Sequence, residues 1–505
     1  MAEIVLATLN ARYIHADIGL RYLYANLREL QHRAVIQEFT ITDQLVDIAE
    51  KILQHAPKIV GLGIYIWNGR QSEKLIRLLK ALAPEVLLVA GGPEVSHLPL
   101  RLDFSLVDHI ICGEGEKSFQ QLCRAHLCQR NRYPRIIEAH PPDLDSLVMP
   151  YAFYTDEDIA HRIIYAETSR GCPFTCEFCL SAMEKKVRYF PLDRFLVALE
   201  TLWQRGARTF KFIDRTFNLS MHRVAPILDF FLAQEPAYLV HFEVVPEHFP
   251  QALRDKLRQF PPGTLQLEVG IQTLNPAVAA SINRRLNMHK ITDNLQFLEQ
   301  ETNAHLHVDL IIGLPGESAD SFGENLNRLV AMTRAEIQLG VLKKLSGTTI
   351  DRHDMIHRMT YLPYPPYEIL ANDLIDFTLM QDLKRMARFW DLLYNSGNFK
   401  RSVRMLWLEQ DVYQGFLHFS RWLYTSTLST WQISLKRMVE LLFCYLTGEM
   451  QLPPEEVANT LARDILAIKG RSLPAVVAKH CTIPQGTIQP QGPSSPGKRQ
   501  TRHLS

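Results

Sequence analysis

The chain has 505 residues with 55 basic and 54 acidic side chains, which gives a formal net charge of +1. This balance offers no electrostatic support for a nucleic-acid partner or an acidic membrane surface. The length suggests about three or four domains, and 47% hydrophobic with 22% charged residues is an ordinary globular composition. The start, MAEIVLATLN, lacks a basic segment ahead of a long apolar core, and no apolar run reaches the roughly 18 residues of a membrane span. We therefore expect a cytoplasmic protein without a membrane partner.

Residues 1–140 alternate strand-like and helix-like segments. Four apolar, β-leaning runs lie at 3–9, 58–67, 86–94 and 108–116, and helical patterns such as QSEKLIRLLKALA lie between them. Strands that alternate with helices predict a doubly wound, Rossmann-like α/β domain with a parallel sheet. In such sheets the ligand binds outside the carboxyl ends of the strands.

Glycines and polar residues follow these strands, where a ligand would bind. Glycine lets the backbone approach a large ligand closely, although turn formation alone explains these glycines equally well. No G-x-G-x-x-G fingerprint is present, and the acidic turn at 113–115 disfavours a pyrophosphate, so a nicotinamide site is not expected. The candidate ligand-binding residues are Asn10, Tyr65, Gly91, Gly92, Pro93, Glu94, Gly113, Glu114 and Gly115.

Residues 160–350 repeat the alternation of strand and helix six times. Strand-like runs lie at 163–169, 209–214, 238–245, 264–272, 305–313 and 336–342. The clearest helical pattern covers 191–206, with Pro191 near its start and Gly206 at its end. Six successive βα units predict a (β/α)6 partial TIM barrel, whose active face is formed by the carboxyl ends of its strands.

Three cysteines follow the first strand of this region, in the segment GCPFTCEFCL. Cys172, Cys176 and Cys179 have the spacing C-x3-C-x2-C. Structural zinc prefers four ligands, often as C-x2-C pairs, and no second pair follows downstream. Thiolates suit iron–sulfur clusters, and three of them on a four-iron cluster leave one iron open. An open coordination position is typical of a catalytic metal.

The C-x3-C-x-aromatic-C motif, with Phe178 as its aromatic residue, resembles the radical S-adenosylmethionine (SAM) superfamily. The resemblance implies a 4Fe-4S cluster whose open iron binds SAM and whose electron cleaves it to a 5′-deoxyadenosyl radical. The segments at 211–218, 267–273, 309–317 and 342–349 resemble strand ends of that family. Simpler alternatives are an Asp214–Arg215 ion pair and plain turn glycines at 313 and 316. The implied SAM contacts are Phe178, Asp214, Asn218, Glu268, Gln272, Ile311 and Gly313.

The N-terminal region resembles the cobalamin-binding domain that precedes the barrel in many radical SAM enzymes. Gly91 and Gly92 match the paired glycines of that fold. The D-x-H-x-x-G lower-ligand motif has no match in register, because the corresponding stretch reads YIHADIG, with His15 present and Asp17 and Gly19 displaced. The resemblance therefore implies cobalamin without a protein histidine on cobalt, and His15 as a cobalt ligand is the minor alternative.

A proline-broken segment, LPYPPY (362–367), precedes a helical region. Apolar residues then recur at helical spacing and predict an all-helical domain over 365–478. Pro, Gly, Gln and Ser dominate 482–505, which predicts a disordered tail. With domains at 1–140 and 160–350, the order resembles a bacterial cobalamin-binding radical SAM family whose C-terminal domain has no assigned function.

The resemblance implies an enzyme with three cofactors: a 4Fe-4S cluster, SAM and cobalamin. The leading hypothesis is methylation of an unactivated carbon (or a phosphorus) of an unknown substrate, in which the radical abstracts a hydrogen atom and methylcobalamin delivers the methyl group. One alternative is cobalamin-dependent oxidation, cyclisation or rearrangement without net methyl transfer. Another is a non-catalytic cobalamin or redox sensor. An electron donor such as flavodoxin or ferredoxin is the implied partner.

Overall fold

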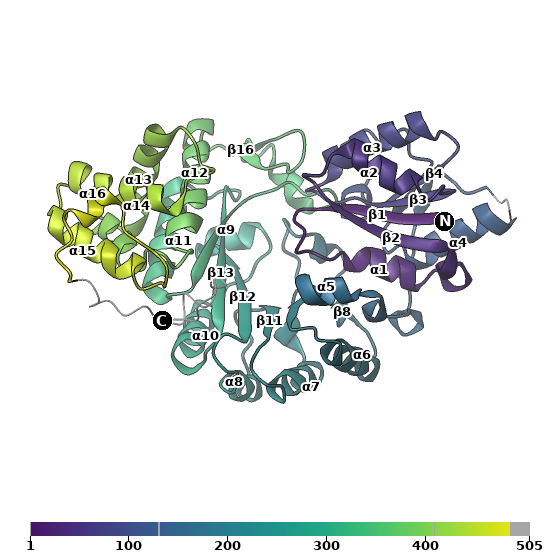
Figure 1. Cartoon of the computed structure of the whole chain (residues 1–505), viewed down its shortest axis with the longest axis horizontal. Helices are drawn as coiled ribbons and strands as arrows, with labels where there is room; N and C mark the ends of the chain where they lie inside the picture. Colours follow the sequence, from purple (N-terminus) through teal and green to yellow (C-terminus); the bar gives the residue numbers. More distant parts are fainter. Residues whose placement is uncertain (1, 130–131, 409, 485–505) are drawn as a thin grey trace. The chain divides into compact units, whose positions relative to one another are not determined.

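The computed structural model describes residues 2–129, 132–408 and 410–484 (Figure 1). The chain divides into two compact units. The first contains Met1–Glu243, Lys343–Asp351 and Tyr361–Glu368, and the second contains Val244–Leu342, Arg352–Thr360 and Ile369–Ser505. From residue 485 onward, the predicted tail over 482–505 lies outside the described residues.

The first unit begins with a six-stranded parallel sheet in the order β2-β1-β3-β4-β5-β6. Its strands are β1 (Ile4–Asn10), β2 (Ala34–Thr40), β3 (Ile59–Gly63), β4 (Leu87–Gly91), β5 (His109–Cys112) and β6 (Ile136–Glu138). One face is covered by α2 (Leu45–Leu53) and α3 (Gly69–Leu82), and the other by α1 (Ile18–Ala25) and α4 (Glu116–Arg124) (Figure 1). This arrangement confirms the predicted doubly wound sheet.

The burial of each strand explains why some of these strands could be predicted from the sequence and others could not. All seven residues of β1 are buried, as expected of a central parallel strand with helices on both faces. The edge strand β2 places Gln37 and Glu38 among apolar residues, and most of its residues are only half-buried. β2 and the three-residue β6 were not among the predicted strands. Because the strand order reverses beside β1, the carboxyl ends of β1 and β3 form the expected ligand crevice.

The rest of the first unit contains three parallel strands of the second predicted region, β7 (Ile164–Ala166), β10 (Thr209–Phe212) and β11 (Leu239–Val244). Helices α5 (Asp156–His161), α6 (Leu192–Gln204) and α7 (Met221–Leu232) alternate with them. β10 contributes Phe210 and Phe212 to a buried aromatic core, which Phe195, Phe231 and Phe242 complete. This core fixes the carboxyl end of β10, where predicted site residues follow.

The second unit contains the other three predicted strands, β12 (Leu265–Gln272), β13 (His305–Ile312) and β14 (Glu336–Val341), again in parallel. Between and before them lie α8 (Gln251–Leu257), α9 (Pro276–Ser281), α10 (Met288–Glu301) and α11 (Ala319–Met332). Side chains alternate along β13: Leu306, Val308 and Leu310 are buried on one face, whereas the other carries His305, His307, Asp309 and Ile311. All six predicted strands of residues 160–350 are therefore confirmed.

The second unit ends in helices, as the sequence predicts. These are α12 (Phe377–Leu393), α13 (Val412–Thr427), α14 (Leu435–Cys444), α15 (Pro454–Ile465) and α16 (Ala475–Ala478). The short strand β16 (Ile369–Ala371) precedes them, and the division between the units falls within the two-residue strand β15 (Thr360–Tyr361). Leu383, Met386 and Trp390 of α12 are fully buried at helical spacing and form part of the core.

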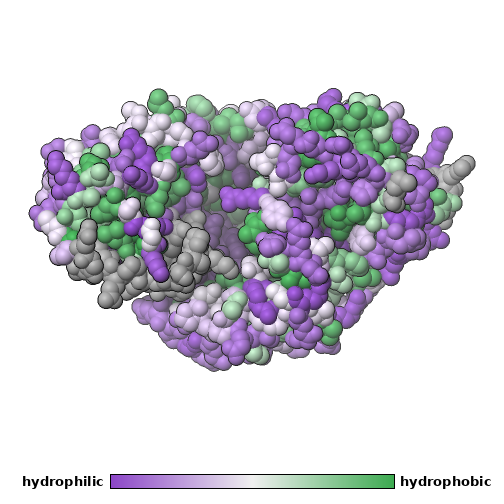
Figure 2. Space-filling view, viewed as in Figure 1, coloured by the Kyte–Doolittle hydropathy of each residue, from purple (hydrophilic) through white to green (hydrophobic). Residues whose placement is uncertain are grey.

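The visible surface is mostly hydrophilic, with smaller hydrophobic patches scattered over it (Figure 2). Within the described part of the chain, no helix combines the length and the apolar character that crossing a bilayer requires.

Candidate active site

The three predicted cluster cysteines lie on a loop that two short strands close at its base. β8 (Ser169–Arg170) and β9 (Arg188–Tyr189) pair antiparallel, so residues 171–187 form a loop whose two ends lie side by side. Gly171 opens the loop with φ +89°, and a Cβ there would lie 2.5 Å from the carbonyl oxygen of Lys186. Only glycine fits this close crossing of the two arms.

The cysteines are held by the backbone of this loop. The N–H of Cys172 donates to the carbonyl of Glu184 (2.9 Å), and the N–H of Cys179 donates to the carbonyl of Cys176 (3.1 Å). Cys172 and Cys176 are buried, and Cys179 is half-buried. Burial raises the pKa of the Cys172 thiol, a backbone hydrogen bond from Phe174 opposes the rise, and the nearby Cys179 and Cys176 add to it. All three cysteines therefore belong to one short loop, as ligands of one cluster must.

The other cysteines lie on other elements. Cys112 donates to the carbonyl of Val95 across 3.4 Å, Cys123 is buried in an apolar core, and Cys128 is exposed. The remaining two, at 444 and 481, belong to the second unit. The loop thus offers three thiolates, which fit an iron–sulfur cluster with one open iron better than a four-ligand structural zinc site.

Asp214 lies just beyond β10 and fixes the segment that leads into the cysteine loop. Its buried carboxylate accepts hydrogen bonds from the N–H of Thr168 (3.0 Å), the hydroxyl of Thr168 (2.6 Å) and the hydroxyl of Ser169 (2.5 Å). Burial raises its pKa, and the hydrogen bonds from Ser169 and Thr168 oppose the rise. The neighbouring Arg215 forms an ion pair with Glu243 (2.9 Å). Asp214 is therefore placed to orient the loop, and its contact with SAM stays a prediction.

Arg170, at the base of the loop, joins the loop to the N-terminal sheet region. Its guanidinium lies 2.5 Å from Glu114, 2.7 Å from Glu116 and 3.1 Å from Glu167. Burial disfavours the charge on Arg170, but the three carboxylates outweigh it and raise its pKa well above the usual value. Glu114 also pairs with Arg188 on the other arm of the loop. Both arms are thus tied to the turn after β5.

A cavity of about 700 Å³ in the first unit lies at the carboxyl ends of β1, β3, β4 and β5. Eight of the nine residues predicted there line it, namely Asn10, Tyr65, Gly91, Gly92, Pro93, Gly113, Glu114 and Gly115. Residues near β7 and β10 line it as well, including Tyr165, Glu167, Arg170 and Ile213. The cavity therefore reaches from the N-terminal sheet to the base of the cysteine loop.

Glu94 is the ninth predicted residue, and it does not line the cavity. Its carboxylate instead accepts a hydrogen bond from the hydroxyl of Tyr367. Burial raises the pKa of Glu94, and the hydrogen bond from Tyr367 opposes the rise. Because Glu94 follows a strand end, it was predicted to contact the ligand. Its side chain instead binds Tyr367, which is distant in the sequence.

The paired glycines after β4 differ in what they require. Gly92 has φ +105° and ψ 173°, a backbone conformation that is essentially confined to glycine, and a Cβ there would lie 2.5 Å from the carbonyl oxygen of Ile64. A Cβ on Gly91 would meet only the carbonyl oxygen of Ile111, at 3.8 Å. Gly92 therefore holds the cavity wall in place, and Gly91 leaves space beside it.

We expect Gly92→Ala to destabilise the first unit by about 2 kcal/mol or more, because it adds a backbone clash to a conformation that costs about 1–3 kcal/mol for other residues. The midpoint of thermal unfolding measures this loss. Gly206→Ala is the matched control, since Gly206 has φ +99° but nothing within 4 Å of its Cβ position. Equal destabilisation by both substitutions would show that the clash with Ile64 is unimportant.

Further aromatic and titratable side chains also line the cavity, among them Trp67, His15 and Asp17. Trp67 stacks on Tyr65 with ring centroids 4.4 Å apart. Nδ1 of His15 lies 2.7 Å from the hydroxyl of Tyr165, and burial, reinforced by nearby positive charges, lowers the pKa of His15. Asp17 accepts the N–H of Leu20 as the N-cap of α1. His15 thus lies at the cavity with one ring nitrogen already engaged by Tyr165.

The residues predicted to contact SAM fall in both units. In the first, Phe178 is half-buried and Asn218 is fully buried in the turn after β10. In the second, Glu268 lies half-buried on β12, which ends at Gln272 with a bulge and a φ of +74°. Ile311 lies near the end of β13, and Gly313 follows it with φ +85°. A Cβ on Gly313 would lie 2.7 Å from Cγ2 of Ile369. Glycine is therefore required there by this close contact as well as by the turn.

Glu317, which ends the segment DLIIGLPGE, is a titratable residue that the sequence analysis left without a role. It is fully buried, and its Oε1 accepts hydrogen bonds from the hydroxyl of Thr273 (2.7 Å) and the side-chain amide of Asn325 (2.7 Å). Burial raises its pKa to about 7, against the opposing effect of these two hydrogen bonds. The only sequence signal was an acidic residue directly after Gly316, a turn glycine that follows β13.

We expect Glu317→Gln to stabilise the second unit above pH 7. A carboxyl whose pKa rises from 4.5 to about 7 on folding binds more protons in the folded state, so stability falls as pH rises from 4.5 to 7. The full cost is on the order of 3 kcal/mol. Unfolding midpoints of wild type and variant should diverge over this pH range, whereas Glu324→Gln, on the exposed side of α11, should leave the wild-type profile unchanged. If the unfolding midpoints of wild type and Glu317→Gln changed in parallel with pH, the raised pKa of the Glu317 carboxyl would be contradicted.

Three family models match separate stretches of the chain. Residues 4–123 match the B12 binding domain, residues 166–329 match the Radical SAM superfamily, and residues 356–487 match a protein family of unknown function (DUF4080). The chain therefore contains a region that matches the B12 binding domain and a region that matches the Radical SAM superfamily, which confirms the recognition made from its motifs. Its helical C-terminal region is the part that matches DUF4080.

Among curated relatives, the chain is 28% identical over 338 residues to the cobalamin-dependent radical SAM methyltransferase TokK of Streptomyces tokunonensis, covering 59% of this chain and 48% of TokK. It is 27% identical over 311 residues to the 2-(S-pantetheinyl)-carbapenam-3-carboxylate methyltransferase of Streptantibioticus cattleyicolor, covering 54% of this chain and 45% of that protein. The chain thus spans about half the length of these relatives.

A solved structure with a similar fold is the cobalamin-dependent S-adenosylmethionine radical enzyme OxsB with aqua-cobalamin and S-adenosylmethionine bound. The TM-score is 0.61 at 12% identity, and the similarity covers 91% of this chain and 78% of OxsB. At this identity the comparison shows a shared fold.

Proposed function

We propose that this chain is a radical SAM enzyme that uses cobalamin to methylate an unactivated carbon, or a phosphorus, of a substrate not yet identified. The observation that carries the proposal is that the three-cysteine loop and the cavity of the B12-binding domain adjoin within one unit. Arg170 lies at the base of the loop and also lines the cavity. Two relatives named as methyltransferases support methylation over other uses of the same cofactors.

The proposed 4Fe-4S cluster is held by Cys172, Cys176 and Cys179, whose donor set leaves one iron open. Cobalamin is proposed to bind in the cavity, where glycines at the ends of β4 and β5 keep side chains away from the ligand. No histidine is required on cobalt, and the hydrogen bond between His15 and Tyr165 is in keeping with this arrangement. The proposed cobalamin contacts are the eight predicted residues that line the cavity.

SAM is proposed to contact Phe178 and Asn218 near the cysteine loop, and Glu268, Gln272, Ile311 and Gly313 from β12 and β13. Asp214 is proposed to act mainly by orienting the segment before the loop. When bound, the cluster and SAM supply a carbon radical and cobalamin supplies a methyl carrier. The chain's own residues bind and orient these groups, and the buried loop base excludes water from them.

The proposal includes an electron donor such as flavodoxin or ferredoxin and a cytoplasmic location, where thiols stay reduced. Domains at 1–140, 160–350 and 365–478 are proposed on the support of the family matches at 4–123, 166–329 and 356–487.

The test uses anaerobically reconstituted protein with hydroxocobalamin, dithionite and SAM labelled in its methyl group. We expect bound corrinoid, formation of 5′-deoxyadenosine, and label on the cobalamin. Absence of 5′-deoxyadenosine from protein with an intact cluster would contradict an enzyme and favour a sensor. Formation of 5′-deoxyadenosine with no label on cobalamin would favour oxidation, cyclisation or rearrangement instead of methyl transfer.

A further inference from the structure

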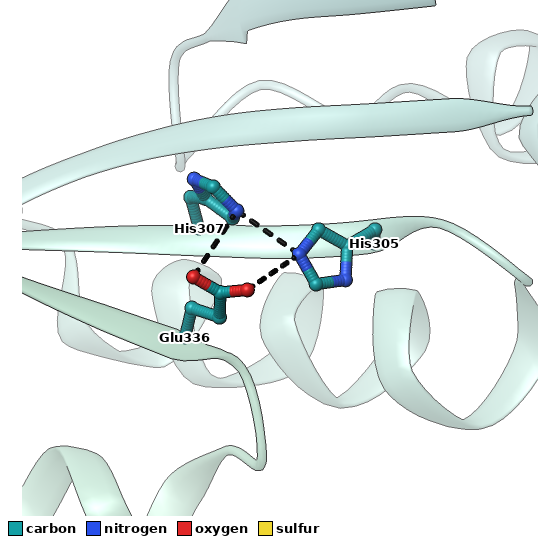
Figure 3. Close-up of side chains that lie close together, drawn as sticks. All are labelled: His305, His307 and Glu336. Atoms are coloured by element: carbon teal, nitrogen blue, oxygen red, sulfur yellow. Dashed lines mark hydrogen bonds and ion pairs between the residues drawn. The ribbon is translucent and has the colours of Figure 1, made fainter. Parts of the chain in front are cut away.

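A second cluster of metal-ligating side chains lies in the second unit. His305 and His307 of β13 and Glu336 of β14 point toward one another from neighbouring parallel strands (Figure 3). His307 is the direct cross-strand partner of Glu336, and His305 lies two residues earlier on the same face of β13. All three residues therefore meet at the amino-terminal ends of their strands.

The distances within this cluster suit a single ion. Nε2 of His305 lies 3.0 Å from Nε2 of His307 and 3.0 Å from Oε1 of Glu336. Nε2 of His307 lies 3.6 Å from Oε2 of Glu336. A tetrahedral ion with bonds of about 2.0–2.1 Å separates its ligand atoms by about 3.3–3.4 Å. The observed separations bracket this value, so an ion fits with small movements of the side chains.

Burial shields the cluster from water. The side chains of Glu336, His305 and His307 are 1%, 6% and 15% exposed. Two imidazole nitrogens that lie 3.0 Å apart and approach the same carboxylate need either a shared proton or a cation among them. A cation satisfies the lone pairs of all three groups at once.

A carboxamide beside His307 matches the surroundings of a metal-binding histidine. Nε2 of Gln338 lies 2.6 Å from Nδ1 of His307. A half-turn of this amide exchanges its nitrogen and oxygen within the same space and presents the oxygen to Nδ1–H. Metal-ligating histidines donate their second N–H to such an oxygen, which directs the lone pair of Nε2 to the metal.

We propose that His305, His307 and Glu336 bind one divalent transition-metal ion of the zinc class. Two imidazoles and one carboxylate, with water at the fourth position, form a donor set that zinc accepts. The ion crosslinks β13 to β14 at the amino ends of the strands, which in βα folds serve stability while the carboxyl ends serve chemistry. The site does not depend on the proposed methylation.

The test uses the full-length chain with Cys172→Ser, Cys176→Ser and Cys179→Ser, so that the cluster thiolates cannot take up added zinc. This protein is stripped of metal, incubated with Zn²⁺ alone and desalted, and it should then retain one zinc per chain. Co²⁺ in place of Zn²⁺ should give the visible absorption of a four-coordinate ion. Zn²⁺ should also raise the midpoint of thermal unfolding. In this background, His305→Gln and Glu336→Gln should each weaken zinc binding by about tenfold or more and remove the shift in midpoint.

His357→Gln is the matched control, because His357 is another histidine of this unit with a carboxylate nearby, its Nδ1 lying 3.5 Å from Oδ2 of Asp373. This variant should retain the zinc. Gln338→Leu leaves all three ligands in place and should weaken binding by about tenfold or more. Absence of zinc from the parent protein, or full retention by both His305→Gln and Glu336→Gln, would overturn the site and leave a hydrogen-bonded polar cluster.

Discussion

Replacing Cys176 with alanine should abolish incorporation of the iron–sulfur cluster and, with it, reductive cleavage of SAM. Three thiolates are the whole cysteine set of the loop, so removing one leaves two, and the five other cysteines lie on other elements. Iron and sulfide content and visible absorption of the reconstituted variant should fall to background. Formation of 5′-deoxyadenosine with SAM and dithionite should fall below detection.

Cys128→Ala is the control for this result, because Cys128 is exposed and lies outside the loop. It should keep the wild-type iron content and SAM cleavage. The unfolding midpoint of apo Cys176→Ala, compared with that of apo wild type, separates loss of a ligand from loss of the fold. Full iron in a folded Cys176→Ala protein would show that the cysteines are misassigned.

The elements that the sequence predicted best are those whose signal is local. Parallel strands covered on both faces read as continuous apolar runs, which is why β1 and β3 were recognised. Strands of 160–350 such as β13 alternate apolar and polar residues, which is also a local signal. The edge strand β2 escaped because half-burial lets polar residues such as Gln37 and Glu38 interrupt its pattern. The cysteine spacing is likewise local, so the loop and its three thiols could be identified before the fold was known.

The contacts that give the site its form are not local. Arg170 and Glu114 are 56 residues apart, and Arg188 and Glu114 are 74 apart, so no spacing rule brings them together. The hydrogen bond between Glu94 and Tyr367 spans 273 residues. Position after a strand end predicted where Glu94 would lie, yet it could not tell which partner its side chain would find.

The histidine cluster shows a third case, a local signal without a known motif. His305 and His307 are two residues apart in a strand, so they face the same side, and this much could be read from HLH. Glu336 completes the cluster only through the register of β13 with β14. Cross-strand register is a property of the fold, and a single sequence does not state it.

Replacing Arg170 with methionine should destabilise the first unit by about 3–5 kcal/mol, the usual cost of removing one partner from a buried ion cluster. Its side chain is 12% exposed and is surrounded by Glu114, Glu116 and Glu167. Methionine keeps much of the volume but leaves three acidic groups without their shared cation. The thermal midpoint should fall, and limited proteolysis should cut the loop at 171–187 earlier than in wild type.

Arg77→Met is the control, because Arg77 also pairs with two carboxylates, those of Glu73 and Asp103, but on the surface. Exposed ion pairs contribute little because water and salt screen them, so its midpoint should stay at the wild-type value. Arg170→Lys should recover part of the loss, since it restores the charge without the fork that reaches several carboxylates. Equal midpoints for Arg170→Met and Arg77→Met would show that the buried cluster contributes no more than a surface pair.

The pH dependence of Arg170→Met separates lost charge from lost packing. Burial, only partly opposed by the charge of Arg170, raises the pKa of Glu167 in the wild type, so without the cation this pKa should rise further. A carboxyl with a raised folded-state pKa costs stability above its unfolded value, so the variant should be closest to wild type at acidic pH and should lose ground as pH rises. The same change at the loop base should lower iron incorporation at neutral pH, because Glu114 would then hold only the Arg188 arm of the cysteine loop. If the stability loss of Arg170→Met were independent of pH and its iron content were normal, Arg170 would have a packing role alone. It would then not connect the cavity to the cluster loop.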